Sequence, residues 1–334
     1  MFAHCKNKYL WLITQMRWKS VFLTFLLLAS FAKAQVITKS FGTGANSFTM
    51  DFVTVSNPGN RADTAGSPNP VGAVDYVYNI GRYEVSHDMV IKATAAGSLG
   101  IGMQDMTFWT TAAANGLNRP ATGITWLEAA TFVNWLNTSS GYSAAYKFGS
   151  DGLFRLWLPS DPGYNSRNQF RNSNANYFIP NVDEWYKAAF YDPNKNGGSG
   201  GYWKYSTGSD AEPTPVENGS FQGTMVYKGQ YAPADINDAG GFSPYGTMAQ
   251  GGNVKEWIET AADGLNDVPG EDKGSRGGAW GSNAADVAAT AYGGAWQTWD
   301  WPDQGFRVAM IPEPSTFSLL TAIMGGLVAF RLRK

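Results

Sequence analysis

Three short motifs in the last third of the chain combine glycine with tryptophan, glutamate or arginine. They are Gly-Asn-Val-Lys-Glu-Trp at residues 252–257, Arg-Gly-Gly-Ala-Trp at residues 276–280 and Gly-Phe-Arg-Val at residues 305–308. Glycine permits backbone angles that other residues avoid, and a planar guanidinium beside it can hold several carbonyls or a carboxylate at once. We therefore interpret Arg276 and Arg307 as structural residues, with a substrate clamp as the alternative.

Glycine and aromatic residues are abundant, with 39 glycines and 13 tryptophans in 334 residues. Charged residues make up 16% of the chain, below the ~25% of a typical globular protein. This balance is typical of a domain with long irregular connections and an aromatic core. The formal net charge is −2 and no basic cluster lies within residues 35–310, so we expect no binding to nucleic acid.

The N-terminus has the organisation of an export signal. Basic residues precede an apolar run at residues 21–29, and an Ala-Lys-Ala sequence then supplies small residues where a signal peptidase reads them. We expect residues 1–34 to be a signal peptide that is cleaved before Gln35, with an uncleaved membrane anchor as the alternative. The single cysteine, Cys5, lies in this segment, so the mature chain has no cysteine for a disulfide.

The C-terminus carries a second targeting pattern. Pro-Glu-Pro at residues 312–314 is followed by an apolar stretch at residues 317–330 and a basic end. This order resembles the PEP-CTERM sorting tail of Gram-negative bacteria, which implies an exosortase-type processing enzyme as a partner. The apolar stretch can enter a membrane while the basic end stays on the cytoplasmic side. We expect export to the cell envelope or the extracellular space, with transient membrane contact through both termini; an ordinary single-span anchor is the alternative.

Capping residues mark the starts of three predicted helices. Ser86 can cap the first helix. Thr125 with Glu128, and Asn181 with Glu184, have the spacing of a capping box. The second helix also shows apolar residues at helical spacing, which are Ala129, Phe132, Val133 and Leu136. In the third helix we expect Trp185, Ala188 and Ala189 to face the core.

The segments between these helices predict strands and loops. Alternating apolar and polar residues at 48–52 predict a strand, and residues 74–85 resemble a second one. Glycine and serine dominate residues 194–210, which predicts a long surface loop. Its aromatic stretch at residues 202–205 is interpreted as either a packed plug or a ligand platform.

In their order, the three motifs resemble the formylglycine-generating enzyme family, also called the sulfatase-modifying-factor family. Residues 83–86 and 179–185 are similar to the family's Tyr-Glu-Val-Thr and Leu-Pro-Thr-Glu-x-Glu-Trp helix starts. The resemblance implies an α+β fold related to C-type lectins, in a single domain with much irregular structure. The predicted organisation is a signal peptide at 1–34, a short N-terminal segment at 35–47, the domain at 48–310 and the sorting tail at 311–334.

Two cysteines that the family's oxidase uses to hold copper are absent from this chain. Just after the Arg-Gly-Gly motif, the corresponding residues are Ser282 and Val287. Copper(I) needs soft ligands such as thiolate, and neither serine nor valine supplies one, so we expect no copper and no oxidase activity. Family members that make sulfoxides use iron held by histidines. The only histidines here are His4 and His87, which form no cluster, and we interpret His87 as a surface or half-buried residue.

The first motif is a candidate calcium site. The resemblance places calcium on the carbonyls of Gly252 and Val254 and on the side chain of Glu256, and hard oxygen ligands of this kind suit calcium. The family usually has Asp or Asn where this chain has Ala249, and an aromatic residue where it has Lys255. We therefore expect weak calcium binding, and the alternative is that Glu256 pairs with a nearby arginine.

The densest group of tryptophans follows the second motif. In the family this region borders the substrate groove, and aromatic faces near polar groups bind sugars or peptides. We expect most of the four tryptophans, which include Trp301, to lie in the core and one or two to form a binding face. The candidate ligand-binding groove comprises Ser282, Val287, Trp280, Trp296 and Trp299.

Together these observations predict an exported, surface-sorted, non-catalytic domain of the sulfatase-modifying-factor fold. It would act as a binding or surface module, with an extracellular polysaccharide or a peptide as its partner. One alternative is an enzyme of other chemistry on the same fold. The other is a structural component of an extracellular matrix.

Overall fold

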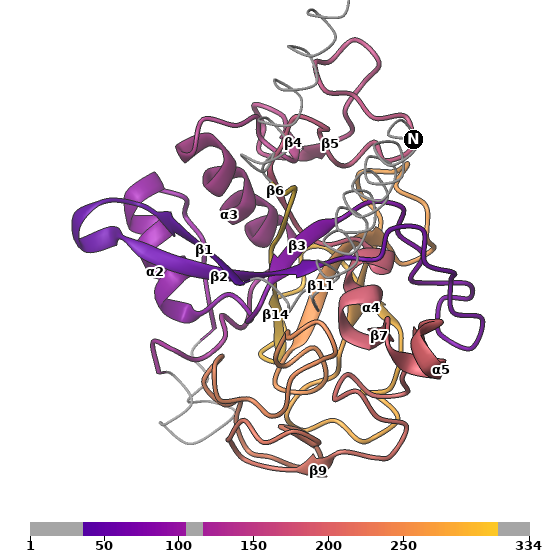
Figure 1. The fold of residues 1–334 in the computed structure, drawn as a ribbon. Coiled ribbons are helices and arrows are strands. Elements are labelled where there is room, and N and C mark those ends of the chain that lie inside the picture. The colour runs from indigo at the N-terminus through magenta and orange to yellow at the C-terminus, as the bar shows by residue number, and fades with distance from the viewer. Residues whose placement is uncertain (1–35, 105–115, 313–334) are drawn as a thin grey trace, which may run out of the picture. The chain divides into compact units, whose positions relative to one another are not determined.

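A five-stranded sheet and a four-stranded sheet form the framework of the protein in the computed structural model (Figure 1). The structure describes residues 36–104 and 116–312. In chain order the elements are β1 (Val36–Phe41), η1 (Gly44–Asn46), β2 (Phe48–Val55), β3 (Tyr78–Gly81), α2 (His87–Gly97), α3 (Trp126–Ser139), β4 (Lys147–Phe148), β5 (Phe154–Arg155), β6 (Tyr177–Phe178), α4 (Val182–Phe190), β7 (Tyr191–Asp192), α5 (Lys195–Gly198), β8 (Gly201–Tyr202), β9 (Thr214–Pro215), β10 (Thr224–Met225), β11 (Lys255–Ala261), β12 (Lys273–Arg276), β13 (Gly293–Ala295), β14 (Gln304–Phe306) and β15 (Ala309–Met310).

The five-stranded sheet is antiparallel, in the order β1-β2-β3-β15-β6. Its strand β2 confirms the predicted alternation, because Phe48, Met50 and Phe52 are all buried. Strand β1 pairs with β2 along its whole length, from Val36 opposite Val53 onwards. The separation of a short N-terminal segment from the domain is therefore wrong in this respect, since the domain's edge strand lies within that segment.

The three predicted helix starts are confirmed. The Ser86 side chain accepts a hydrogen bond from the Met89 backbone amide at the start of α2. Thr125 and Glu128 form a complete capping box at the start of α3, and Asn181 and Glu184 do the same at the start of α4. Each box satisfies backbone amides that have no partner within the helix.

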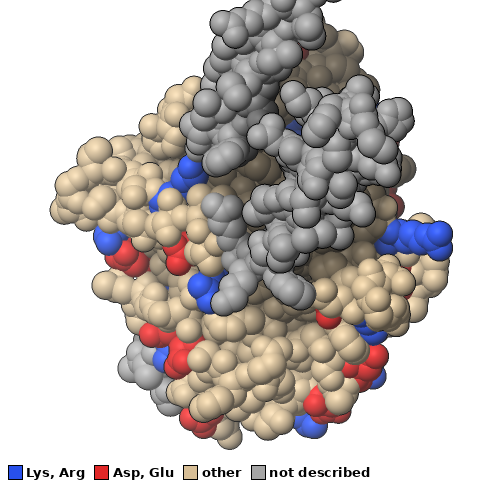
Figure 2. Space-filling model, in the orientation of Figure 1, with Lys and Arg blue, Asp and Glu red and all other residues tan. Residues whose placement is uncertain are grey.

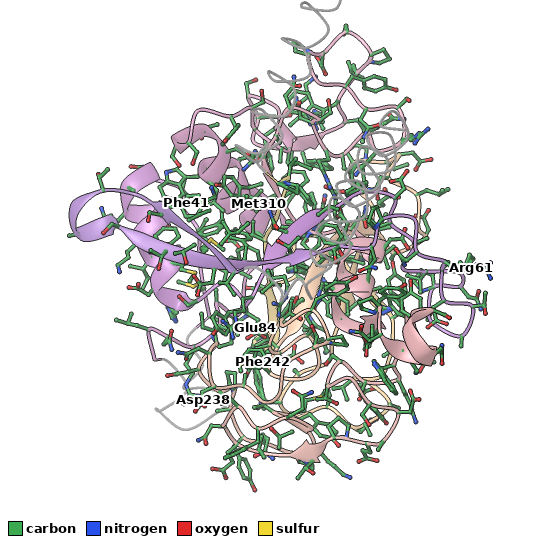
Figure 3. The ribbon with its side chains drawn as sticks, in the orientation of Figure 1. Phe41, Arg61, Glu84, Asp238, Phe242 and Met310 are labelled. Atoms are coloured by element: carbon green, nitrogen blue, oxygen red, sulfur yellow. The ribbon has the colours of Figure 1, made fainter. Side chains whose placement is uncertain are left out.

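The largest apolar core contains side chains from the five-stranded sheet, α2 and α3. Phe48 stacks on Phe132 and Trp135 of α3, with ring centroids 6.3 and 5.9 Å apart. Phe41 and Met310, labelled in Figure 3, belong to the same core. In Figure 1 the β1–β2 hairpin lies on the same side as α2 and α3, whereas α4 and α5 lie on the other side.

The four-stranded sheet has the order β13-β12-β11-β14. Two hydrogen bonds from indole N–H groups join its central strand β11 to the start of α3 and to the residues just before it. Trp126 of α3 donates to the Ile258 carbonyl at 3.1 Å, and Trp257 donates to the Ile124 carbonyl at 2.8 Å. Because these indoles are fully buried, their hydrogen bonds fix the position of β11 relative to α3.

Two connecting segments differ from the sequence prediction. Within residues 74–85 only β3 is a strand, so the predicted second strand is shorter than expected. Residues 194–210 contain the short elements α5 and β8. In its aromatic stretch Tyr205 is buried and Tyr202 packs on Tyr186 and Tyr191. These contacts favour the packed plug over the ligand platform.

The predicted signal peptide lies outside the described residues, and so does the predicted sorting tail apart from residues 311 and 312. Within the ranges 36–104 and 116–312, no helix has the length and apolar character needed to cross a membrane.

Candidate functional site

The first and third motifs meet at a buried ion pair. Arg307 Nη2 lies 2.5 Å from Glu256 Oε1, and Arg307 Nε lies 2.7 Å from Glu256 Oε2. Arg307 also donates to the carbonyls of Gly81 and Met248, and Trp185 Nε1 donates to Glu256 Oε2 at 2.6 Å. Neither charged side chain is exposed to solvent. Arg307 is therefore structural, as the sequence predicts.

A second buried carboxyl group, Glu84, holds the backbone of the first motif. Its Oε2 accepts a hydrogen bond from Asn253 Nδ2, and its Oε1 accepts one from the Val254 amide. Figure 3 labels Glu84 near the ribbons of β11 and β14. Burial raises the pKa of Glu84 well above its ordinary value, and the charge of Glu256 raises it further. Glycine is required at Gly252, where φ is +74° and a Cβ would lie 2.2 Å from a backbone oxygen.

The geometry of the candidate calcium site favours the ion-pair alternative. Both carboxylate oxygens of Glu256 accept hydrogen bonds from Arg307, so a calcium ion on Glu256 would compete with a guanidinium. Within the described part of the chain, no group of three or more His, Cys, Asp or Glu side chains is placed to hold a metal ion. Calcium binding through Gly252, Val254 and Glu256 stays a prediction.

Arg276 of the second motif is buried and is held by backbone carbonyls. Its Nη1 donates to Ala291 at 2.7 Å, and its Nη2 donates to Ser67 and to Ala289. The guanidinium lies over the Tyr186 ring, 4.8 Å from its centroid. Burial lowers the pKa of Arg276 to about 10. The predicted structural role is confirmed, and the same residue also lines a cavity.

Ser282 and Val287, which the resemblance places at the positions of the family's two cysteines, lie together beside Gly278. A Cβ built on this glycine would lie 2.9 Å from Val287 Cγ1 and 3.2 Å from Ser282 Cβ, so both side chains contact the same backbone position. Val287 is buried, while Ser282 is partly exposed and lines two cavities. Of this pair, only Ser282 lies at the surface, and Val287, one of the five predicted groove residues, is buried and does not line these cavities.

Two adjoining cavities form a groove over the four-stranded sheet. The first has a volume of about 280 Å³ and the second about 160 Å³. They adjoin each other, because Lys255, Ser275 and Gly293 line both. The second is also lined by Gly294 and Ala295 of β13. These small side chains leave the space that the groove occupies above the strands.

A third cavity extends the groove past Ser282. Its volume is about 470 Å³, and it shares Ser282 and Asp286 with the first cavity. Trp280 and Asp303 also line it. We call these three cavities the groove.

Exposed tryptophans form one wall of the groove. Trp299 and Trp301 line the second cavity and stack on each other, with ring centroids 5.3 Å apart and ring planes 11° apart. Trp296 packs on Trp299 at 5.4 Å. Trp296, Trp299 and Trp301 are 60%, 37% and 50% exposed, whereas Trp280 is 9% exposed. The expectation that most of the four lie in the core is therefore wrong, because three of them are on the surface. We call Trp299 and Trp301 the tryptophan wall.

Lys255 is the groove residue whose role the sequence did not predict. Its Nζ lies 2.9 Å from Asp303 Oδ2 and 5.5 Å from the centre of the Trp301 ring. In the described residues, Asp303 Oδ1 has no hydrogen-bond partner. The sequence signal is the departure at Lys255 from the aromatic residue that the family favours at this position.

Among the described residues, no histidine lines the groove. His87 is half-buried at the start of α2, as expected, and burial lowers its pKa. On the face shown in Figure 2, acidic and basic side chains of the described residues lie interspersed among neutral ones. The expectation that the protein does not bind nucleic acid stays a prediction.

Solved structures with similar folds support this architecture. Treponema denticola variable protein 1 is 20% identical, with a TM-score of 0.53 over 83% of this chain and 99% of that one. CarF is 19% identical, with a TM-score of 0.54 over 79% and 99%. PvdO from Pseudomonas aeruginosa is 14% identical, with a TM-score of 0.51 over 82% and 98%. At these identities the similarity shows the fold alone, and it confirms the predicted α+β fold.

The sequence comparisons identify the family. No curated protein matches the sequence. The family model described as "Sulfatase-modifying factor enzyme 1-like domain" (FGE-sulfatase) matches residues 44–311. Because this match covers most of the chain, the protein belongs to the sulfatase-modifying factor enzyme 1-like family.

Proposed function

We propose that this protein is an exported, non-catalytic member of its family whose groove binds an extracellular polysaccharide. The tryptophan wall is the observation that carries the proposal. Trp299 and Trp301 are 37% and 50% exposed, and contiguous exposed apolar surface of this kind is typical of an interaction site. A sugar ring has a C–H face that can cover an indole and hydroxyl groups that can bond to polar neighbours such as Ser275 and Ser282.

The residues that replace the family's cysteines support the absence of oxidase chemistry. Ser282 Oγ accepts a hydrogen bond from the Ala279 amide at 2.9 Å. Among the described residues, no hydrogen bond joins this hydroxyl to a histidine, lysine or carboxylate that would activate it as a nucleophile. A serine without a base and a buried valine therefore support a binding role for the groove.

The sequence patterns at the two ends of the chain support the export and surface sorting that are part of the proposal. Mass spectrometry of the mature protein from its native host tests them. We expect a start at Gln35 and an end within residues 312–315. Recovery of a mature form that still ends at Lys334 would favour the membrane anchor and contradict sorting by cleavage.

A glycan array probed with the purified protein tests the binding function. We expect binding to a restricted set of polysaccharide fragments. Trp301→Ala should weaken it at least tenfold, because one exposed stacking face is removed. Tyr231→Ala is the matched control, since Tyr231 is 82% exposed and does not line the groove. Binding that is equal in the wild type and in Trp301→Ala would contradict the proposal. Turnover of a bound glycan would favour the enzyme alternative.

A further inference from the structure

The loop that carries the tryptophan wall is anchored to its surroundings through its backbone. The amides of Gly123 and Gln304 both donate to the Trp301 carbonyl, at 3.2 and 3.0 Å. The amide of Lys255 in β11 donates to the Asp303 carbonyl at 2.9 Å. These hydrogen bonds fix the path of the chain after Trp301, but they leave the direction of its indole ring open.

The indole of Trp301 is half exposed, and so is much of its stacking partner. Trp301 is 50% exposed and stacks on Trp299, which is 37% exposed. An exposed side chain samples several rotamers, and each rotamer lost on binding costs free energy. A contact that fixes the ring before a ligand arrives lowers this cost. Such a contact therefore raises affinity without touching the ligand.

Lys255 supplies a contact of this kind from the four-stranded sheet. Its Nζ lies 5.5 Å from the centre of the Trp301 ring, within the distance at which an ammonium group is attracted to an indole. The same Nζ lies 2.9 Å from Asp303 Oδ2, and the two side chains are only 31% and 25% exposed. Because the pair is partly buried, salt screens it less than a fully exposed pair. Asp303 thus holds the ammonium beside the ring.

We propose that Lys255 is a positioning residue of the groove, whose ammonium, held by Asp303, keeps the Trp301 indole in the orientation in which the tryptophan wall binds its saccharide. This inference rests on the proposed function, because it names the residue that orients the wall of the same groove. Lys255 lines the first and second cavities. Its role there is indirect, since it acts through the ring and not through a contact with the sugar.

The indole N–H resonances of the ligand-free protein test this orientation. NMR of protein with ¹⁵N-labelled tryptophan reports the indoles separately, and the Trp301 resonance is identified by its loss in Trp301→Phe. Lys255→Met keeps an apolar side chain and removes the charge. We expect it to shift the Trp299 and Trp301 resonances and to lower their heteronuclear NOE, because the rings become mobile on the picosecond to nanosecond timescale. Lys255→Arg keeps a cation for both contacts and should restore the wild-type values.

Lys195 provides the matched control, because it makes the same two kinds of contact elsewhere. Its Nζ lies 3.2 Å from Asp210 Oδ2 and 3.7 Å from the centre of the Trp203 ring. None of these three residues lines the groove. Lys195→Met should therefore shift the Trp203 resonance and leave those of Trp299 and Trp301 unchanged.

Binding titrations relate the orientation of the ring to affinity. With the glycan that binds the wild type most tightly on the array, Lys255→Met should lower affinity about two- to fivefold, the range of one exposed cation–π contact. Asp303→Asn should lower it by no more than this. The double variant should bind like Lys255→Met, because Asp303 acts through the lysine. Lys255→Arg should recover most of the affinity, and thermal melts check that each variant is folded.

The outcomes distinguish this proposal from the function on which it rests. Unchanged Trp299 and Trp301 resonances in a folded Lys255→Met would overturn the proposal even if affinity fell, because the lysine would then act on the sugar directly. Shifted resonances with unchanged affinity would also overturn it, since the orientation of the ring would not matter for binding. If no glycan of the array binds, the proposed function is wrong, while the spectra of the ligand-free protein still decide whether Lys255 orients the ring.

Discussion

Glu256 of β11 and Arg307, which follows β14, form a two-point ion pair that solvent does not reach. The pair joins the first and third glycine-rich motifs through one carboxylate and one guanidinium. Arg307 then extends the connection to the carbonyls of Gly81 and Met248. The first and third motifs, which are far apart in the sequence, thus converge on one buried charge pair.

Breaking this pair should strongly destabilise the fold. Glu256→Gln leaves the guanidinium of Arg307 buried without its counter-charge, so we expect a loss of about 3–5 kcal/mol in the free energy of unfolding. Asp88→Asn is the matched control, because the Lys92–Asp88 pair is partly exposed on α2 and should cost about 1 kcal/mol or less. Urea denaturation of the three proteins measures the difference. Equal losses for the two variants would show that the buried pair has no special role.

Lys273 should make stability depend on pH. It is fully buried, its Nζ lies 3.5 Å from the centre of the Phe170 ring, and that nitrogen has no hydrogen-bond partner among the described residues. Burial lowers the pKa of Lys273 to about 7, against ~10.4 for an unfolded chain. Between these values the unfolded chain binds more protons, so stability rises with pH in this window.

Lys273→Met should remove that dependence. At pH 7 and below we expect the variant to be more stable than the wild type by roughly 2–4 kcal/mol, because the cost of a buried amine is removed while the favourable contact with the aromatic ring is lost. The gap should shrink as the pH approaches 10. Urea denaturation at pH 7 and at pH 9.5 measures both gaps. A variant that is less stable at both pH values would mean that Lys273 stabilises the fold.

Calcium should change stability only slightly. With a dissociation constant of roughly 0.1–1 mM, 1 mM calcium should raise the melting temperature by about 1–3 °C. Ala249→Asp should enlarge the effect, because it adds the oxygen ligand that the family usually has, and Glu256→Gln should remove it. Thermal melts in calcium and in a chelator provide the measurement. If both the wild type and Ala249→Asp melt identically in the two buffers, Glu256 serves the ion pair alone.

The wild-type protein should not oxidise a cysteine-containing peptide in the presence of copper. The double substitution Ser282→Cys with Val287→Cys should instead bind copper(I), since both side chains lie beside Gly278 and thiolates are the ligands that this ion prefers. A competition assay with a copper(I) indicator compares the two proteins, and mass spectrometry of a Cys-x-Pro-x-Arg peptide follows oxidation. Oxidised product from the wild type above a metal-only control would contradict the absence of catalysis.

The sequence predicts those features that depend on residues close together in the chain. Thr125 with Glu128, and Asn181 with Glu184, are three residues apart, and their capping boxes form as the spacing requires. The family motifs likewise predict the fold, and Glu256 was assigned an arginine partner as one alternative. Such features can be predicted because their physical cause lies within a single turn of helix or a single motif.

Features that depend on distant segments could not be predicted in this way. Whether Trp299 and Trp301 face solvent or the core depends on where their loop lies over the four-stranded sheet. The contacts of Lys255 in the groove are likewise made with Asp303 and with that loop. Strand β1 lies outside the resemblance and pairs with β2 through backbone hydrogen bonds, for which its sequence carries little specific signal.

Isothermal titration of the wild type and of the Trp299→Ala, Trp301→Ala double variant, each with a glycan selected on the array, tests the central claim most directly. The account predicts that the double variant keeps the melting temperature of the wild type, because both indoles are exposed. Its affinity should fall about 10- to 100-fold, because two stacking faces are lost. An unchanged affinity in a folded double variant would contradict the account, since the tryptophan wall would then have no part in binding.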